Sequence, residues 1–329
     1  MTSKKICFFR LNNHIGDVVI TSFFVRELKK HFASDSLTVV ASDPVDKLYF
    51  ENPHVNELLR LPAMCYPVPK EAGSFTRLPF SFNLFYHLAK ILWNIRRQHY
   101  DLLITDIFVP TWRNKLFFKC CAAKHIILPQ YKQKTVEHLS QTYGRVLKQL
   151  GMSDIDYAYE LYLSPQQKEK AMTFLKQHAL HSPFILLNPL ASITQRSLSE
   201  EQIITVLDTI HKCAPHIPIL LLDYRNQYRA LAEKAVLCHL DDIRVVTALI
   251  QQAKGIITVD TSTVHLSDLF YKPMLAIYAH DKYSFANNIK IFGSIQPGTI
   301  YLQSQDKISD IPLSTLQESV SNFLKKLPN

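Results

Sequence analysis

Residues 255–278 read GIITVDTSTVHLSDLFYKPMLAIY, and this stretch carries the pattern of one complete β-α-β unit. The apolar run GIITV predicts a buried strand, which breaks off at Asp260 into small polar and β-branched residues. STVHLSDLF then predicts a helix, and Pro273 opens a second apolar run, PMLAIYA, which predicts the next strand. Strand, helix and strand in this order are the unit of an α/β fold with a parallel sheet.

The same alternation runs through both halves of the chain. The expected strands are KKICFFRL, SLTVVAS, VNELLRL, YDLLITD and HIILPQ in the first half, and PFILLNP, IPILLLD, GIITVD and PMLAIYA in the second. Helices are expected at VVITSFFVRELKKHF, SEEQIITVLDTIHKC, QYRALAEKAV, VVTALIQQAK and STVHLSDLF. Because the alternation restarts between residues 160 and 182, and 329 residues exceed one ordinary core, the sequence predicts two Rossmann-like domains facing each other across a cleft. We expect them to span residues 1–165 and 166–329.

Composition narrows the class of protein. Hydrophobic residues make up 47% and charged residues 20%, which is typical of a globular chain. No apolar run reaches the roughly 18 residues of a membrane-spanning helix, and MTSKKICFFR lacks the apolar core of a signal peptide, so we expect a cytoplasmic protein. The six cysteines show no zinc-site spacing and are expected as buried thiols.

The formal net charge of +9 favours anionic partners such as phosphates, acidic sugars or the inner membrane face. The basic residues are scattered and match no nucleic-acid-binding motif, so no nucleic-acid partner is expected. Residues 63–100 form a long connection in which basic and aromatic residues alternate. This pattern favours a packed helix, with membrane-surface or acceptor contact as the alternative. The residues concerned are Arg77, Lys90, Arg96 and Arg97, among Phe80, Phe82, Phe85, Tyr86 and Trp93.

Ligands of open parallel sheets bind at the carboxyl ends of the strands, where helix N-termini offer free N–H groups. This rule predicts that residues 12–17 in one half and residues 260–265 in the other line the same cleft. Hydroxyls and amides at the start of the second helix suit a phosphate, the acidic residue before them suits sugar hydroxyls, and the histidine is expected to face the same ligand. The residues are Asp260, Thr261, Ser262, Thr263 and His265. The alternative is plain helix capping, which needs only one such residue.

Three segments together resemble glycosyltransferase family 9, the ADP-heptose:lipopolysaccharide heptosyltransferases. RLNNHIGDVVITSFFVRELKKHF is similar to the family's N-terminal signature, NPLASITQRSLSEEQI to its nucleotide-side segment, and GIITVDTSTVHLSDLFYKPMLAIY to its second signature. The chain departs from the family at several positions. Phe23 stands where the family has proline, Ser262 where it has glycine, Arg196 where it has lysine, and Leu198 and Ser199 where it has Trp-Pro. Arginine keeps the positive charge that binds phosphate.

The resemblance implies a GT-B fold and inverting transfer of a sugar from a nucleotide-activated donor, ADP-heptose, to the inner core of lipopolysaccharide. It implies Asp17 as the general base, for which the alternative is a helix-capping aspartate. The leaving diphosphate would be met by Arg196 and by residues 261–263. Since such groups can replace a metal ion, we expect no divalent cation and no cofactor.

The C-terminal half is expected to bind the nucleotide sugar, and the N-terminal half the anionic lipopolysaccharide-core acceptor, with peripheral contact to the inner membrane. The expected acceptor-binding residues are Asn13, His14, Arg60 and Arg77.

Other classes of protein are also compatible with this sequence. A nicotinamide oxidoreductase would share Rossmann-like halves, but RLNNHIGD lacks its G-x-G-x-x-G fingerprint. An epimerase, or a transferase using another nucleotide sugar, would have the same cleft. A carbohydrate-binding protein without activity is a further alternative, against which Asp17, Asp260 and His265 argue.

Overall fold

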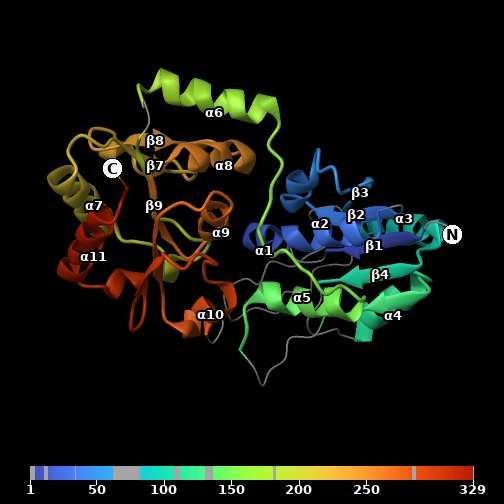
Figure 1. Ribbon diagram of the computed structural model, residues 1–329. Coiled ribbons are helices and arrows are strands. Elements are labelled where there is room, and N and C mark those ends of the chain that lie inside the picture. The colour runs from blue at the N-terminus through green and yellow to red at the C-terminus, as the bar shows by residue number, and fades with distance from the viewer. Residues whose placement is uncertain are drawn as a thin grey trace. The chain divides into compact units, whose positions relative to one another are not determined.

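The computed structural model describes residues 4–10, 14–33, 35–61, 82–106, 112–129, 136–180, 183–283 and 287–328. The chain divides into two compact units, Met1–Tyr162 and Leu163–Asn329, each with its own parallel sheet (Figure 1). The boundary between the units lies three residues before the one expected from the sequence.

Unit 1 is built on a five-stranded parallel sheet with the order β3-β2-β1-β4-β5. At the carboxyl end of β1, Phe9 is paired with Val40 of β2 and with Thr105 of β4. The ends of these three strands therefore lie side by side. The strands are β1 (Lys5–Phe9), β2 (Ser36–Ser42), β3 (Glu57–Leu61), β4 (Leu102–Thr105) and β5 (His125–Ile127).

Helices cover both faces of this sheet because successive strand residues point to opposite sides. On one face, Phe9 contacts Phe118 of α4 and lies in one buried cluster with Ile95 of α3. On the other face, Phe8 packs on Phe24 of α2, with ring centroids 5.1 Å apart. The helical elements are α1 (Ile15–Ile20), α2 (Ser22–His31), the short 3-10 helix η1 (Val45–Tyr49), α3 (Phe82–Gln98), α4 (Trp112–Cys120) and α5 (Leu139–Gln149).

Unit 2 is built on a six-stranded parallel sheet with the order β11-β10-β9-β6-β7-β8. Its strands are β6 (Ile185–Asn188), β7 (Ile219–Leu222), β8 (Val236–Cys238), β9 (Gly255–Val259), β10 (Met274–Tyr278) and β11 (Ile300–Gln303). Its α-helices are α6 (Pro165–Gln177), α7 (Glu200–Cys213), α8 (Ile243–Gln252), α9 (Ser262–Asp268), α10 (Asn288–Phe292) and α11 (Leu313–Lys325). The 3-10 helices are η3 (Thr194–Arg196), η4 (Arg229–Leu231), η5 (Asp281–Tyr283) and η6 (Ile308–Asp310).

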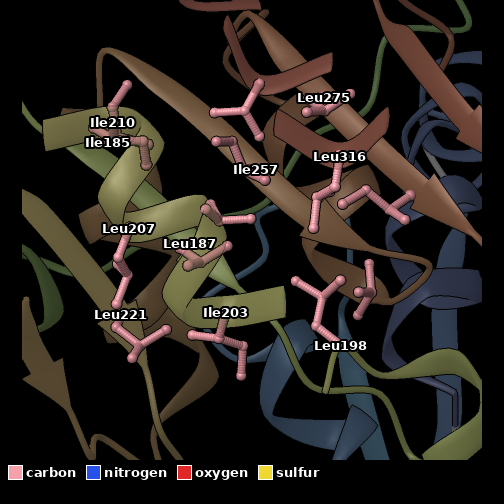
Figure 2. Packing of buried hydrophobic residues seen from close by; sticks show 14 of the residues in the cluster. Ile185, Leu187, Leu198, Ile203, Leu207, Ile210, Leu221, Ile257, Leu275 and Leu316 are labelled. Carbon is pink, nitrogen blue, oxygen red and sulfur yellow. The ribbon is translucent and has the colours of Figure 1, made fainter. Parts of the chain in front are cut away.

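A continuous apolar core joins α7 and α11 to one face of this sheet. Figure 2 shows strand residues such as Leu187 and Ile257 pointing toward Ile203 of α7 and Leu316 of α11, and all four are fully buried. This packing fixes α7, and with it the loop that leads from β6 into α7.

Two expectations about the second half were wrong. QYRALAEKAV is not a helix, because the chain there forms η4 and then the strand β8. No strand was expected after PMLAIYA, but β11 follows it and pairs in parallel with β10. Both missed strands lie at the edges of the sheet, where three or four half-buried residues give too short a pattern to be distinguished from a helix or loop.

In the part of the chain that the structure describes, none of the helices has the length and apolar character needed to cross a membrane.

The segment that leads out of unit 1 is tied to α2 by one side chain. Arg26, buried to 8% exposure, donates hydrogen bonds to the backbone carbonyls of Asp156, at 2.7 Å, and Ala158, at 2.9 Å. The backbone N–H of Glu160 donates to the hydroxyl of Ser22, at 2.8 Å. These bonds hold the last stretch of unit 1 along the helix.

We expect Arg26→Met to lower the free energy of unfolding by about 2–4 kcal/mol, because it removes charge-assisted hydrogen bonds and takes one of two cations, the other being Lys30, from the buried carboxylate of Glu27. The chain's two tryptophans, Trp93 and Trp112, both lie in unit 1, so urea unfolding followed by their fluorescence reports on this unit. Lys124→Met, at an exposed ion pair with Asp101, is the matched control and should change little. Equal stability of the two variants would contradict the anchoring role.

Candidate functional site

A buried ion pair lies at the carboxyl edge of the unit 1 sheet. Arg10 directly follows β1 and Asp106 directly follows β4, and these strands are parallel neighbours. Nη2 of Arg10 lies 3.4 Å from Oδ2 of Asp106, and the two side chains are 1% and 2% exposed. Strand pairing therefore brings together two charges that are almost a hundred residues apart in the sequence.

Arg10 also supports the start of the first helix. Its Nη1 donates to the hydroxyl of Thr21, the residue between α1 and α2. That hydroxyl in turn donates to the backbone carbonyl of Asp17, at 2.7 Å. The guanidinium is thus connected through one side chain to the backbone of the predicted base.

The surroundings of Arg10 keep it charged. Burial alone lowers the pKa of Arg10, but Tyr49, Asp106, Tyr143 and Asp17 raise it, and the net result lies above the ordinary arginine value. Burial raises the pKa of Tyr49 to about 12, even though the cation acts against this. Arg10 is therefore a charged member of a buried ion pair at the carboxyl end of β1.

Asp17 is the third residue of α1, and its carboxylate is partly exposed, at 15%. Its Oδ2 lies 3.8 Å from Nδ1 of His14, whose side chain is 71% exposed. His14 is the N-cap residue, so the alternative that Asp17 caps this helix is wrong. Asp17 lies instead in the first turn, where the helix dipole favours a carboxylate.

The remaining acceptor residues are not gathered around Asp17. Arg60 lies on β3, with Nε 3.5 Å from Oδ2 of Asp46 and its guanidinium over the ring of Phe50. Since the order is β3-β2-β1, Arg60 is two strands away from β1, which precedes the helix that carries Asp17. Asn13 and Arg77 lie outside the described residues.

In unit 2, one amide connects two strand ends. Asn188 ends β6 and is paired with Thr258 of the neighbouring β9. Its Nδ2 donates to Oγ1 of Thr261, at 3.0 Å, and to Oγ1 of Thr263, at 2.7 Å. Thr261 is the N-cap of α9 and accepts from the backbone N–H of Thr263. Capping thus engages Thr261, while Ser262 is the partly exposed first residue of the helix.

Arg196 and Asp260 form one unit at the carboxyl end of β9. Nη2 of Arg196, the last residue of η3, donates to the carbonyl of Asp260 and lies 3.0 Å from its Oδ2. The two side chains are 21% and 9% exposed. Within the described residues, Nε of Arg196 is buried and has no hydrogen-bond partner. The cation predicted to meet a phosphate is therefore paired with the carboxylate predicted to meet a sugar.

Other donor-side positions take part in the packing and capping of unit 2. His265 lies on α9, but its side chain belongs to a residue only 4% exposed. Leu198, one of the two residues at the family's Trp-Pro position, packs in the core of unit 2 (Figure 2). Ser199 is the N-cap of α7 and forms a capping box with Gln202. Among the predicted donor-binding residues, Arg196, Thr261 and Ser262 are thus the ones that are partly exposed.

The chain contains one Asp-x-Asp motif, at residues 154–156, whose two carboxylates bear on the expectation that no metal ion is bound. Oδ2 of Asp156 lies 3.1 Å from Nη2 of Arg26, and Oδ1 accepts a hydrogen bond from the backbone N–H of Ala158. Across the described ranges, no group of three or more His, Cys, Asp or Glu side chains is placed to hold a metal ion. The motif lies on the segment that leaves unit 1 and serves there to hold that segment.

Sequence reasoning missed three residues that organise these sites: Arg10, Asp106 and Asn188. Each ends or directly follows an apolar run, in KICFFR, LLITD and ILLN. A polar residue at the end of a buried strand is the signal that could have identified them.

No family model and no curated protein matches this sequence. Among solved structures, a glycosyl transferase family 9 protein of Veillonella parvula DSM 2008 is similar, with a TM-score of 0.78 and 16% identity over 98% of both chains. The ADP-heptose LPS heptosyltransferase II of E. coli has a TM-score of 0.71 and 13% identity, over 98% of this chain and 99% of its own. E. coli heptosyltransferase WaaC, solved with ADP, has a TM-score of 0.70 and 13% identity, over 97% and 99%.

These likenesses confirm the fold class. The chain is an α/β protein with the GT-B fold of glycosyltransferases, and its structural neighbours include a family 9 glycosyltransferase and ADP-heptose heptosyltransferases. The resemblance to that family, inferred from three short segments, is therefore confirmed at the level of the fold.

The far end of α9 is held by a buried carboxylate. Asp268, 2% exposed, accepts hydrogen bonds from the backbone N–H of Ile295, at 3.1 Å, and from Nε2 of Gln296, at 2.9 Å. Burial raises its pKa from 3.8 to about 6, although these donors act in the opposite direction. Asp268 thus links the helix that follows Asp260 to residues 294–296.

This pKa predicts a pH-dependent stability. Between pH 3.8 and about 6 the folded protein holds a proton on Asp268 that the unfolded chain has lost, so stability rises as the pH falls through this window. Relative to Asp268→Asn, which does not titrate there, wild type should gain about 2 kcal/mol from pH 7 to pH 4 in urea unfolding. Asp208→Asn, at an exposed ion pair, is the control. A wild-type-to-mutant difference that stays constant with pH would refute the raised pKa.

Proposed function

We propose that this chain is an inverting glycosyltransferase that moves a sugar from a nucleotide-activated donor, ADP-heptose, to the inner core of lipopolysaccharide. The observation that carries the proposal is likeness of fold over 97–98% of the chain to glycosyltransferases, among them a heptosyltransferase solved with ADP. The same likeness fits a transferase using another nucleotide sugar, so the donor is part of what has to be tested.

The donor would bind to unit 2 at the ends of β6 and β9. A departing diphosphate needs positive charge and hydrogen-bond donors. Arg196 supplies the charge through a guanidinium that is about a fifth exposed and that contacts Asp260 through Nη2. Thr261 and Ser262, at the start of α9, are partly exposed residues. Asn188 fixes the helix start through Thr261, so these groups are positioned before a ligand arrives.

The acceptor would bind to unit 1, with Asp17 as the general base that takes the proton of the attacking hydroxyl. A base needs an accessible carboxylate in a fixed place. The carboxylate of Asp17 is partly exposed, and its backbone is held through Thr21 by the buried Arg10. His14 next to it, together with Asn13, Arg60 and Arg77, is proposed to contact the anionic acceptor.

The proposal includes a reaction without metal ion or cofactor, in the cytoplasm at the inner face of the inner membrane. The decisive experiment is incubation with a panel of nucleotide sugars, with and without truncated lipooligosaccharide, followed by product masses. Transfer only in the presence of the acceptor supports the proposal, and turnover of the donor sugar without an acceptor would favour an epimerase. Loss of transfer in EDTA would contradict the metal-free mechanism.

If Asp17 is the base, Asp17→Asn should lower turnover by about 10²–10⁴-fold at saturating substrates, with unchanged donor affinity and thermal stability. The amide keeps the size of the side chain but cannot accept the proton. Asp43→Asn, an exposed carboxylate in the same unit, is the matched control and should keep full activity. Near-wild-type turnover of a folded Asp17→Asn protein would remove Asp17 from the chemistry.

Arg196→Ala should weaken binding of ADP by about 10–100-fold in calorimetry, the contribution expected of charge-assisted hydrogen bonds. Because this change also removes the cation beside Asp260, the double variant Arg196→Ala/Asp260→Asn separates the two effects. Affinity that stays low in the double variant assigns the loss to the missing cation, whereas recovery assigns it to repulsion by Asp260. Arg229→Ala, an exposed arginine of unit 2, is the control. Unchanged ADP affinity in Arg196→Ala would exclude Arg196 from the site.

A further inference from the structure

The outer face of α3 carries a stripe of aromatic and basic side chains. Tyr86 and Trp93 are 58% and 61% exposed, and Lys90 and Arg97 are exposed as well. Their spacing of i, i+4, i+7 and i+11 places all four along one side of the helix. Trp93 is therefore a large aromatic ring in water, about two turns from a tyrosine, with a cation beyond each ring.

The exposure of this stripe is not a consequence of poor packing. The opposite side of α3 is buried against the sheet, with Ile91 at 9% and Ile95 at 0% exposure. The helix thus has one apolar face for the core of unit 1 and a second, aromatic face that the core does not use. Because exposing large aromatic rings to water is unfavourable, an aromatic face of this kind is typical of an interaction surface.

The neighbouring helix α4 continues the same chemistry. Leu116 is 54% exposed, and Lys115 and Lys119 beside it are exposed. Arg96 of α3 donates to the carbonyl of Cys120 at the end of α4, at 3.3 Å, so the two helices are in direct contact. Both helices pack on the same face of the sheet through the buried cluster that contains Ile95 and Phe118.

The charge of this region has one sign. Residues 82–100 and 112–124 contain no aspartate or glutamate. Their lysines and arginines are Lys90, Arg96, Arg97, Arg113, Lys115, Lys119 and Lys124, of which Lys124 is paired with the flanking Asp101. A surface that combines exposed rings with cations, and no anions, is complementary to a surface of negative charge over an apolar layer.

We infer that the outer face of α3 and α4 docks on an anionic phospholipid bilayer. Tryptophan and tyrosine favour the headgroup level, where the ring is in an apolar medium and its polar group stays hydrated. Lysine and arginine lie along such a surface with their charges at the phosphates, and each adds to the binding. This inference rests on unit 1 alone and does not depend on the proposed reaction.

The test uses the full chain and vesicles without any glycolipid acceptor. In Trp112→Phe, Trp93 is the only tryptophan, so its emission reports on the face directly. We expect a blue shift with mixed phosphatidylglycerol and phosphatidylcholine vesicles, and none with phosphatidylcholine alone. Flotation with the anionic vesicles should weaken about tenfold or more in Lys90→Gln/Arg97→Gln and in Tyr86→Ala/Trp93→Ala.

Matched controls come from α6 of unit 2, where Met172, Lys168 and Lys176 are also exposed. Met172→Ala and Lys168→Gln/Lys176→Gln should bind vesicles like wild type. The inference fails if Trp93 emission does not change, if flotation is equal with neutral vesicles, or if the α3 variants match the controls. A blue shift that grows with protein concentration without lipid would assign the face to a second copy of the chain and also overturn it.

Discussion

Parallel pairing places the carboxyl ends of all strands at one edge of each sheet, and the polar residues that reach this edge need partners there. In unit 1 the edge receives Arg10 from β1 and Asp106 from β4, and the two form a buried ion pair. In unit 2 the edge receives Asn188 from β6 and Asp260 after β9, and each binds groups from other segments. Both candidate half-sites follow from this constraint of topology, whereas the helices around them determine which groups stay accessible.

The two arginines at these edges differ in what their burial permits. Arg10 is 1% exposed and contacts Asp106 and Thr21, so its charge is committed to holding the sheet and the first helix. Arg196 is about a fifth exposed and paired with Asp260 through one nitrogen. A guanidinium that is held by an ion pair and is also partly exposed stays in place and can donate N–H groups to an anion. The arrangement of Arg10 suits a structural role, and that of Arg196 suits the binding of an anionic ligand.

Much of the fold could be predicted from the sequence because buried parallel strands are short continuous apolar runs, as SLTVVAS and GIITV show. The edge strands β8 and β11 escaped because half-buried strands of three or four residues lack such a run. In the candidate site, the residues from Asp260 to Thr263 were identified from their position after a strand, and Arg196 from the resemblance to glycosyltransferase family 9. The pairing of Arg196 with Asp260, and of Arg10 with Asp106, could not be predicted, since it depends on which strands become neighbours.

The long connection before β4 shows why pattern alone leaves alternatives open. Its aromatic and basic residues were compatible with packing and with surface contact, because a helix presents different faces to different surroundings. Packing is confirmed for the side that carries Ile91 and Ile95, while Tyr86 and Trp93 lie on the other side, in solvent. The composition of the segment is thus compatible with both packing and surface contact, and the two are distinguished once the structure shows which way each residue faces. The basic residues of α3 follow the same division, because Lys90, Arg96 and Arg97 are exposed and do not contribute to the core.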